Sequence, residues 1–579
     1  SEPRFWPYDE EFRVTERARR SRGMWPSRTV VGNCLMFGKT RADRGLEWLE
    51  YGMLAKSKLR TPLSIAYAEV ATHNHFVLDR GGKVFKQTAP VIKLSEGASE
   101  DDHLALLGVL NSSTACFWLK QVCHNKGSTV DQAGARQTLD AWENFFQFNA
   151  TNVAKFPVPP QRIQERPRLL NQLSQKLAAF SPAAVCEREA PTFGALDVAH
   201  LSYESIRRRM IAIQEELDWE VYRLYGLVDG DLTYHGDDLP GPALGERAFE
   251  IALARRMAAG EEETTWFTRH GSTPITEMPK QWPTAYRELV QRRLDLIETD
   301  RHLRLLERPE HKRRWAAVPW DTQVDQALRE WLLDRLEQER LWFDAQGRPT
   351  PRSVTQLADE AARDPELTSV LALWEGRPDV PVAESLQRLL AEESVPFLAA
   401  YRYKESGLRK RSAWERTWEL QRAEDRGEQV GPIPVPPKYA NTDFVKQSYW
   451  RARGKLDVPK ERFISYPDAN RDTDPTALLG WAGWDHAQQA LALATIIGAR
   501  ESEGWSDERL VPLIAGLAEL QPWVEQWHAD VHPTYGVSLA AFTREQLAAR
   551  AAQVGKTIDE LRAWRPQPSR RGRKARSTG

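Results

Sequence analysis

The chain has 579 residues, of which 41% are hydrophobic and 28% charged, and its formal net charge is −1. This composition is typical of globular protein with about two to four domains. The near-neutral charge excludes a protein that attracts nucleic acid through its overall field, so any DNA-binding surface must be local. No run approaches ~18 apolar residues, so we expect no membrane-spanning helix; no signal peptide is recognisable either. Since the first residue is Ser1 and not Met, we expect a fragment or a processed chain.

Cysteine usage indicates a reducing compartment. The four cysteines, Cys34, Cys116, Cys123 and Cys186, are too few for a disulfide scaffold in a chain of this length, which predicts a cytoplasmic protein. Cys116, Cys123 and His124 lie close together but lack a C-x2-C pair. Small buried side chains are therefore a better interpretation than a zinc site.

The first 94 residues combine a basic segment with strand patterns. The RARRSR run at 17–22 could contact phosphate, although a solvated surface is favoured. Residues 65–72, 76–78, 83–87 and 90–94 read as strands, and the turn signal DRGG at 79–82 predicts a hairpin.

A β-rich module of this kind could read DNA bases. Asparagine and glutamine pair with adenine, and lysine pairs with guanine. By residue type alone the candidates are Asn74, Lys83, Lys86 and Gln87. For His73 and His75 a core or loop role is favoured, and the lysines could equally form a solvated hairpin edge.

The stretch from Leu104 to Pro160 contains the most informative local patterns of the sequence. An apolar helical stripe at 104–119 is interrupted by Asn-Ser-Ser at 111–113. The polar HNKGS segment at 124–128 is read as a loop. Its Lys126 and Ser128 could bind phosphate, or Gly127 could cap a helix in the left-handed conformation. The closing KFPVPP at 155–160 predicts an extended exit.

The remainder reads as helical. Single helices are predicted at 168–180, 205–227, 246–258 and 412–425, and Gly226 is the predicted stop of the second. Several helices are predicted within each of the regions 283–345, 349–400 and 470–565. Phosphate contact is considered for the basic segment His311–Trp315, although a mixed-charge helical surface is the more general expectation. The prolines at 432–437 predict a stiff extended connector.

Basic and aromatic residues alternate between 401 and 455, a pattern that suits a nucleic-acid surface. Arginine–tryptophan stacking inside a helical domain is an equally good interpretation. The candidate DNA-binding residues here are Lys404, Arg409, Lys410, Arg411, Arg451, Arg453 and Lys455.

Five stretches together resemble the PglX family of adenine-specific DNA methyltransferases, from type 2 BREX phage-defence systems. They are residues 64–94, 104–160, 217–227, 449–469 and 480–486. The LNS helix followed by the KFPVPP exit also resembles the end of the target-recognition domain in bifunctional restriction–modification enzymes. In the 217–227 segment the aromatics are expected to pack the helix against its neighbour.

The motifs of methyl transfer are absent from the sequence. It has no glycine-rich cofactor loop after a strand, and Val158 and Val435 precede its Pro-Pro pairs where the family has Asn or Asp. The resemblance therefore implies no catalytic residue and no cofactor in this chain, with S-adenosylmethionine serving the complete enzyme. It implies a half that binds double-stranded DNA and positions an adenine for a methyltransferase domain supplied in cis or in trans.

We thus expect an α+β fold, with a small β-rich target-recognition module followed by a large helical region. The expected parts are a target-recognition module at 1–160, a helical domain at 161–345, a helical segment and proline-rich connector at 346–436, a helical C-terminal domain at 437–565 and a basic disordered tail at 566–579. The alternative is a protein-interaction scaffold that docks other BREX proteins or a phage inhibitor. No metal–carboxylate cluster supports a nuclease.

Overall fold

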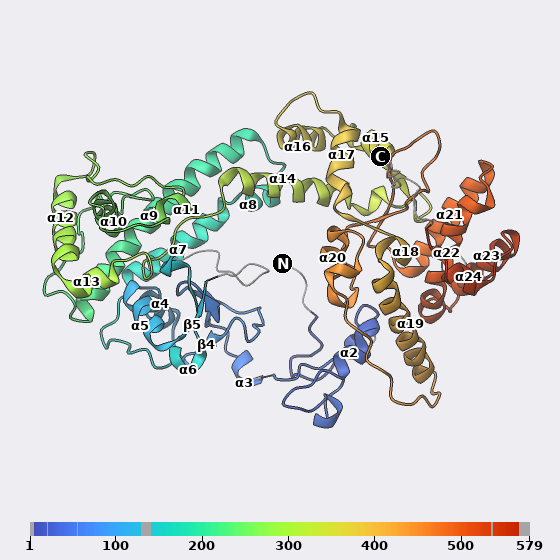
Figure 1. Cartoon of the computed structure of the whole chain (residues 1–579), viewed down its shortest axis with the longest axis horizontal. Coiled ribbons are helices and arrows are strands. Elements are labelled where there is room, and N and C mark those ends of the chain that lie inside the picture. The colour runs from blue at the N-terminus through green and yellow to red at the C-terminus, as the bar shows by residue number, and fades with distance from the viewer. Residues whose placement is uncertain (1–4, 20, 55, 129–139, 534–535, 567–579) are drawn as a thin grey trace, which may run out of the picture. The chain divides into compact units, whose positions relative to one another are not determined.

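The computed structural model describes residues 5–19, 21–54, 56–128, 140–533 and 536–566. They form two compact units: a middle unit of residues 55–327, and a terminal unit that joins residues 1–54 to 328–579 (Figure 1). The predicted α+β fold is confirmed, because helices predominate and the strands form three small sheets. No helix in the described ranges is long and apolar enough to cross a membrane.

The middle unit carries two of the three sheets and a set of helices. Its strands are β1 Ser64–Tyr67, β2 Val70–Ala71, β3 Phe76–Asp79, β4 Val91–Ile92, β5 His124–Gly127 and β6 Phe145–Gln147. Its helices are α3 Lys56–Leu59, α4 Glu100–Leu110, α5 Ser113–Val122, α6 Ala150–Val153, α7 Glu165–Ala179, α8 Pro182–Arg188, α9 Phe193–Leu224, α10 Ala248–Ala258, α11 Trp266–Arg269, α12 Thr284–Thr299 and α13 Arg301–Leu306. Helix α14, Trp320–Leu336, contains the position at which the two units divide.

The two sheets of the middle unit are antiparallel. One has the order β3-β1-β4, with Ser64 opposite Asp79 and Ile65 opposite Ile92. The other has the order β2-β6-β5. Strands β1, β3 and β4 lie in predicted strand segments, and Gly81 and Gly82 form a turn with positive φ. The predicted hairpin across this turn is wrong, because β3 pairs with β1 and not with residues 83–87.

Two details of this region differ from the sequence-based prediction. Residues 83–87 are not a strand; they connect the turn to β4. The HNKGS segment is mostly strand β5, not a loop, because residues 124–127 pair with β6 at the edge of its sheet. Gly127 is left-handed at φ +76°, but at a bulge in this pairing and not at a helix end, since α5 ends at Val122.

The predicted break within 104–119 is confirmed, and the reason is local hydrogen bonding. Asn111 ends α4, and its side-chain amide both donates to Phe76 O and accepts from Phe76 N, each at 2.9 Å. Ser112 then caps α5 by accepting from Ala115 N. This exchange with β3 ties the helix pair to the sheet.

Helix α9 is the longest of the middle unit's helices, and its second half is deeply buried. Trp219 and Tyr222 are fully buried there among apolar residues of α10, α12 and α13, which confirms their expected packing role. Gly226 follows the helix at φ +64°, as the predicted stop requires. The Tyr225 hydroxyl donates to Pro157 O at 2.5 Å, which fixes the extended exit after α6.

The terminal unit is helical around one four-stranded sheet. Its helices are α1 Glu16–Arg19, α2 Arg28–Gly32, α15 Val354–Ala361, α16 Pro365–Glu375, α17 Val382–Ala391, α18 Ala399–Arg402, α19 Glu405–Asp425, α20 Gln447–Arg453, α21 His486–Ser502, α22 Asp507–Trp527, α23 Leu539–Gln553 and α24 Ile558–Arg562. Its strands are β7 Arg352–Ser353, β8 Ser394–Pro396, β9 Phe463–Ser465 and β10 Leu478–Trp481.

This sheet was not expected from the sequence. Its order is β7-β10-β9-β8, with β8 and β9 parallel and the other pairs antiparallel. Each strand has only two to four residues, so none shows the alternation that marks a longer strand. Residues 478–481, assigned to the helical region by sequence, form β10, and the helix begins only after the N-cap Asp485.

The segment that follows residue 21 packs on α19 of the same unit. Trp25 Nε1 donates to Asp425 Oδ2 at 2.7 Å, and Arg28 pairs with Asp425 and Glu424. The predicted connector at 432–437 is extended and also follows α19, where Trp414 Nε1 donates to Pro437 O at 2.9 Å. The two units are larger than the predicted domains, and the finer division at 160, 345 and 436 stays a prediction. Most of the predicted tail, 567–579, and Arg20 of the RARRSR run lie outside the described residues.

Candidate nucleic-acid interface

Three of the four candidate base-reading residues lie on the surface of the middle unit. Lys83, Lys86 and Gln87 follow the Gly81-Gly82 turn and are exposed. Lys83 Nζ lies 3.9 Å from Asp79 Oδ1, a weak pairing for a side chain that is 73% exposed. Lys86 has no carboxylate within ion-pair distance among the described residues. These side chains are therefore available to an external ligand.

Asn74 occupies a different environment. It is buried, and its Nδ2 donates to Leu110 O at 2.6 Å and to Ser112 O at 3.1 Å. Both amide hydrogens are thus used at the junction of α4 and α5. His73 is buried as well, with Nε2 at 2.9 Å from Pro309 O, in agreement with the favoured core role.

Strand β5 presents the remaining candidates of this unit. Lys126 is exposed in this edge strand and has no carboxylate partner among the described residues, whereas Ser128 is buried just after it. The neighbouring Cys116 and Cys123 are buried, as small side chains would be. No group of three or more potential metal ligands occurs within the described ranges.

In the terminal unit the candidates on α19 divide into exposed and internally paired cations. Lys404, which caps α19, and Arg409 are exposed, although Arg409 lies 3.9 Å from Glu405. Lys410 pairs with the buried Asp443 at 2.6 Å. Arg411 is buried and contacts Glu415, Asp457 and Glu519.

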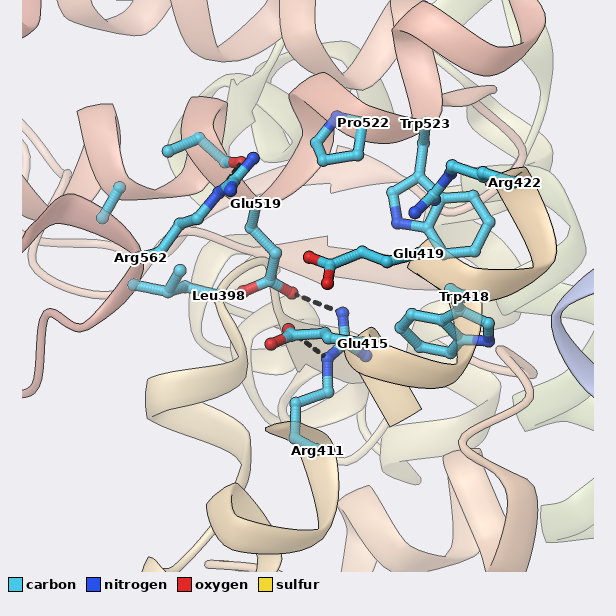
Figure 2. Close-up of a pocket in the computed structure, with 12 residues that line it drawn as sticks. Leu398, Arg411, Glu415, Trp418, Glu419, Arg422, Glu519, Pro522, Trp523 and Arg562 are labelled. Carbon is cyan, nitrogen blue, oxygen red and sulfur yellow. Dashed lines mark hydrogen bonds and ion pairs between the residues drawn. The ribbon is translucent and has the colours of Figure 1, made fainter. Parts of the chain in front are cut away.

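Figure 2 shows Arg411 between Glu415 and Glu519 in a cavity of about 80 Å³ inside this unit. Its guanidinium lies 4.8 Å from the Trp418 ring centroid, and Arg422 lies 4.4 Å from that of Trp523. Burial lowers the pKa of Arg422 to about 10. On α19, therefore, Arg411 and Arg422 stack on tryptophans inside the protein and do not form a nucleic-acid surface. Both arginines pack α19 against α22.

The candidates at the end of α20 divide in the same way. Arg451 is exposed and pairs with Glu392 at 3.2 Å, and Lys455 is exposed without a carboxylate partner among the described residues. Arg453 is nearly buried and pairs with Glu461 and with Asp457, the latter at 3.5 Å. Lys404 and Lys455 are thus the least constrained cations of this group.

Contrary to the phosphate contact considered for residues 311–315, Lys312 lies inside the protein. It is fully buried, and its Nζ lies 3.1 Å from Glu215, 2.9 Å from Asp218 and 2.9 Å from Glu307. An ammonium can be buried when carboxylates surround it: Lys312 Nζ donates to Asp218 and to Glu307, and Glu215 lies within ion-pair distance.

The network extends over several elements of the middle unit. Asp218 also accepts from Ser113 N at 2.9 Å and from Ser113 Oγ at 2.6 Å, and Tyr222 donates to Glu307 at 2.5 Å. Burial raises the pKa of Glu215 to about 7, against the opposing effect of Lys312. Sequence analysis missed this cluster because its members are spread between residues 113 and 312; the run EELD at 215–218 was the available signal.

The residues present do not fit the methyl-transfer chemistry of the family. The valines before the two Pro-Pro pairs, Val158 and Val435, are about half exposed and cannot hydrogen-bond an adenine amino group. The Pro437 carbonyl already accepts from Trp414.

A family model described as a domain of unknown function, DUF7008, matches residues 210–575, more than half of the chain. The chain belongs to the DUF7008 family. The DUF7008 match begins within α9 and includes α19 and α20, while the sheets of the middle unit precede it.

The chain is also similar to a Streptomyces coelicolor protein named adenine-specific methyltransferase PglX. The two are 48% identical over 565 residues, which is 95% of this chain and 46% of the relative. The chain thus spans about half the length of this curated relative, and the resemblance to PglX is confirmed. No solved structure matches the chain.

Proposed function

We propose that this chain is the DNA-binding specificity half of an adenine-specific N6 DNA methyltransferase of a BREX-type phage-defence system. It positions a target adenine in double-stranded DNA for a methyltransferase domain outside the chain, whose cofactor is S-adenosylmethionine. A cytoplasmic location follows from the DNA substrate.

The match to a protein named adenine-specific methyltransferase PglX carries this proposal, together with the lack of catalytic motifs in the matching half. The exposed cations support it. Lys83, Lys86 and Lys126 in the middle unit, and Lys404 and Lys455 in the terminal unit, are free for phosphate because the fold does not bury them.

The test replaces three of these cations together. We expect Lys83→Gln, Lys86→Gln and Lys126→Gln in one chain to weaken duplex binding. Each lost phosphate contact lowers the slope of log affinity against log salt by about 0.9. The measurement is a titration of labelled duplex DNA at several salt concentrations.

A matched control loses the same charge at exposed arginines that already have partners. Arg13→Gln, Arg348→Gln and Arg426→Gln remove side chains paired with Asp9, Asp344 and Glu428 at 3.1, 2.7 and 2.7 Å. Equal loss of affinity in both triple variants would mean that only net charge matters, and would refute the assignment of the lysines.

A second candidate function, a protein-interaction scaffold, is favoured by one surface of the terminal unit. Phe37 is 84% exposed and Leu35 69% exposed on one turn, and Phe37 has the strained φ of +52°. Such a turn would suit another BREX protein or a phage inhibitor. Binding through this apolar turn would not weaken steeply with salt, whereas binding through phosphate contacts would. A titration at several salt concentrations therefore separates the two functions.

A further inference from the structure

The middle unit contains a cavity of about 230 Å³ whose lining lacks acidic residues. The lining comes from β3, α4, α7, α9 and the segment after α13. It combines apolar side chains, such as Leu78, Leu170 and Met210, with several side-chain amides, but no described residue that lines it is aspartate or glutamate. This differs from the cavity in Figure 2, where arginines and glutamates are mixed.

Arg313 is the unusual residue of this cavity, called here the Arg313 pocket. Its guanidinium has no carboxylate within ion-pair distance and no hydrogen-bond acceptor among the described residues. Burial lowers the pKa of Arg313 to about 10, so it remains a cation at neutral pH. The other arginine of the lining, Arg80, is already held by Glu100 at 2.6 Å. A guanidinium at a pocket wall without a carboxylate partner favours an anionic ligand.

The surroundings of Arg313 suit a planar group beside that anion. The guanidinium lies 4.9 Å from the Trp315 ring centroid, and Trp315 Nε1 is buried without a hydrogen-bond partner in the part of the chain described. Asn171 adds a side-chain amide that accepts or donates, and Leu170 and Met210 add apolar surface. Apolar walls with a few placed polar groups are typical of small-molecule sites.

We propose that the Arg313 pocket binds a mononucleotide-sized phosphate ester, with the phosphate on Arg313 and the heterocycle among Trp315 and the amides. The volume is several times the ~30 Å³ that one water occupies in the liquid, so a bare inorganic anion would leave most of it unfilled. This site is separate from the surface lysines and does not depend on their role in DNA binding.

The test is isothermal titration of the 579-residue chain with deoxyadenosine 5′-monophosphate, with deoxyadenosine as the uncharged comparison. We expect the nucleotide to bind more tightly than the nucleoside. Arg313→Gln should weaken nucleotide binding at least about tenfold, because a charge-assisted contact is lost, and leave nucleoside binding unchanged. Lys280→Gln, which removes an exposed lysine of the same unit outside the pocket, should change neither.

A second variant makes the result independent of how Arg313→Gln folds. Ser174 is an exposed residue of α7 at the lining, so Ser174→Trp should block the pocket without disturbing buried packing. Absence of nucleotide binding to the parent chain, or equal binding by the parent and Ser174→Trp chains, would overturn the proposal.

A competition experiment identifies the source of the nucleotide. If a 5′-phosphorylated single-stranded oligonucleotide displaces the mononucleotide, the pocket receives a DNA terminus. If only free nucleotides displace it, the ligand is a free metabolite. Both results support the site. Displacement by inorganic phosphate at the same concentration as by the nucleotide would contradict the role given to the heterocycle.

Discussion

At the scale of single residues, the fold determines which basic side chains are exposed and can contact DNA. Lys410, Arg411 and Lys455 look equivalent in the sequence, yet Asp443 holds the first, three carboxylates hold the second, and the third is exposed. The carboxylate partners Asp457 and Glu519 of Arg411 lie 46 and 108 residues away in the chain. The pattern of neighbouring residues therefore predicted a basic region but not the availability of each charge.

The buried ion cluster gives a stability prediction. Lys312→Met removes the cation that the buried Glu215, Asp218 and Glu307 share, and we expect a loss of about 3–5 kcal/mol in the free energy of unfolding. Denaturant unfolding measures it. Lys126→Met, at an exposed position, should stay within about 0.5 kcal/mol of the parent. A similarly small effect at Lys312 would contradict the cluster.

Glu215 gives a pH prediction. Its pKa of about 7 in the folded state lies above the ordinary value of 4.5, so between these values the folded chain holds a proton that the unfolded chain has lost. Stability from this group therefore falls as the pH rises from 4.5 to 7. In Glu215→Gln we expect this component to vanish, and unfolding measured from pH 5 to 8 should show a weaker dependence. If the pH dependence of unfolding is unchanged in Glu215→Gln, groups other than Glu215 cause it.

At the scale of elements, the sequence was informative wherever a signal is local. The break at 111–113, the stop at Gly226 and the extended proline segments all depend on residues at the position itself. Strand β5 and the sheet β7-β10-β9-β8 were missed, since short strands are created by partners distant in the chain. The pairing of β8 with β9 joins residues about 70 positions apart.

The contact of α4 with α7 gives a prediction at this scale. A Cβ added at Gly108 would overlap the rigid ring of Pro167, so Gly108→Ala should cost about 1–3 kcal/mol despite its better helix propensity. Gly194 in α9 has nothing within 4 Å of an added Cβ. Gly194→Ala should be neutral or up to about 1 kcal/mol more stable. Thermal unfolding of both chains tests this, and equal effects would contradict the close helix approach.

At the scale of the whole molecule, the proposed function rests on the similarity of this chain to part of a longer protein. The chain covers 46% of its PglX relative and lacks the motifs of methyl transfer, while it keeps exposed lysines on both compact units. Residue patterns predicted the family and the α+β fold. They could not predict the buried cluster around Lys312 or the Arg313 pocket, because both are assembled from segments far apart in the chain.

The most direct test of the proposed specificity function is to recover the sequences that the chain binds from a pool of random duplexes, at low and at moderate salt. The proposal predicts salt-sensitive enrichment of one asymmetric motif that contains adenine. Salt-sensitive binding without enrichment would contradict a specificity role and leave a general DNA clamp. No binding at either salt by chain shown to be folded would contradict DNA recognition by this half and favour the scaffold.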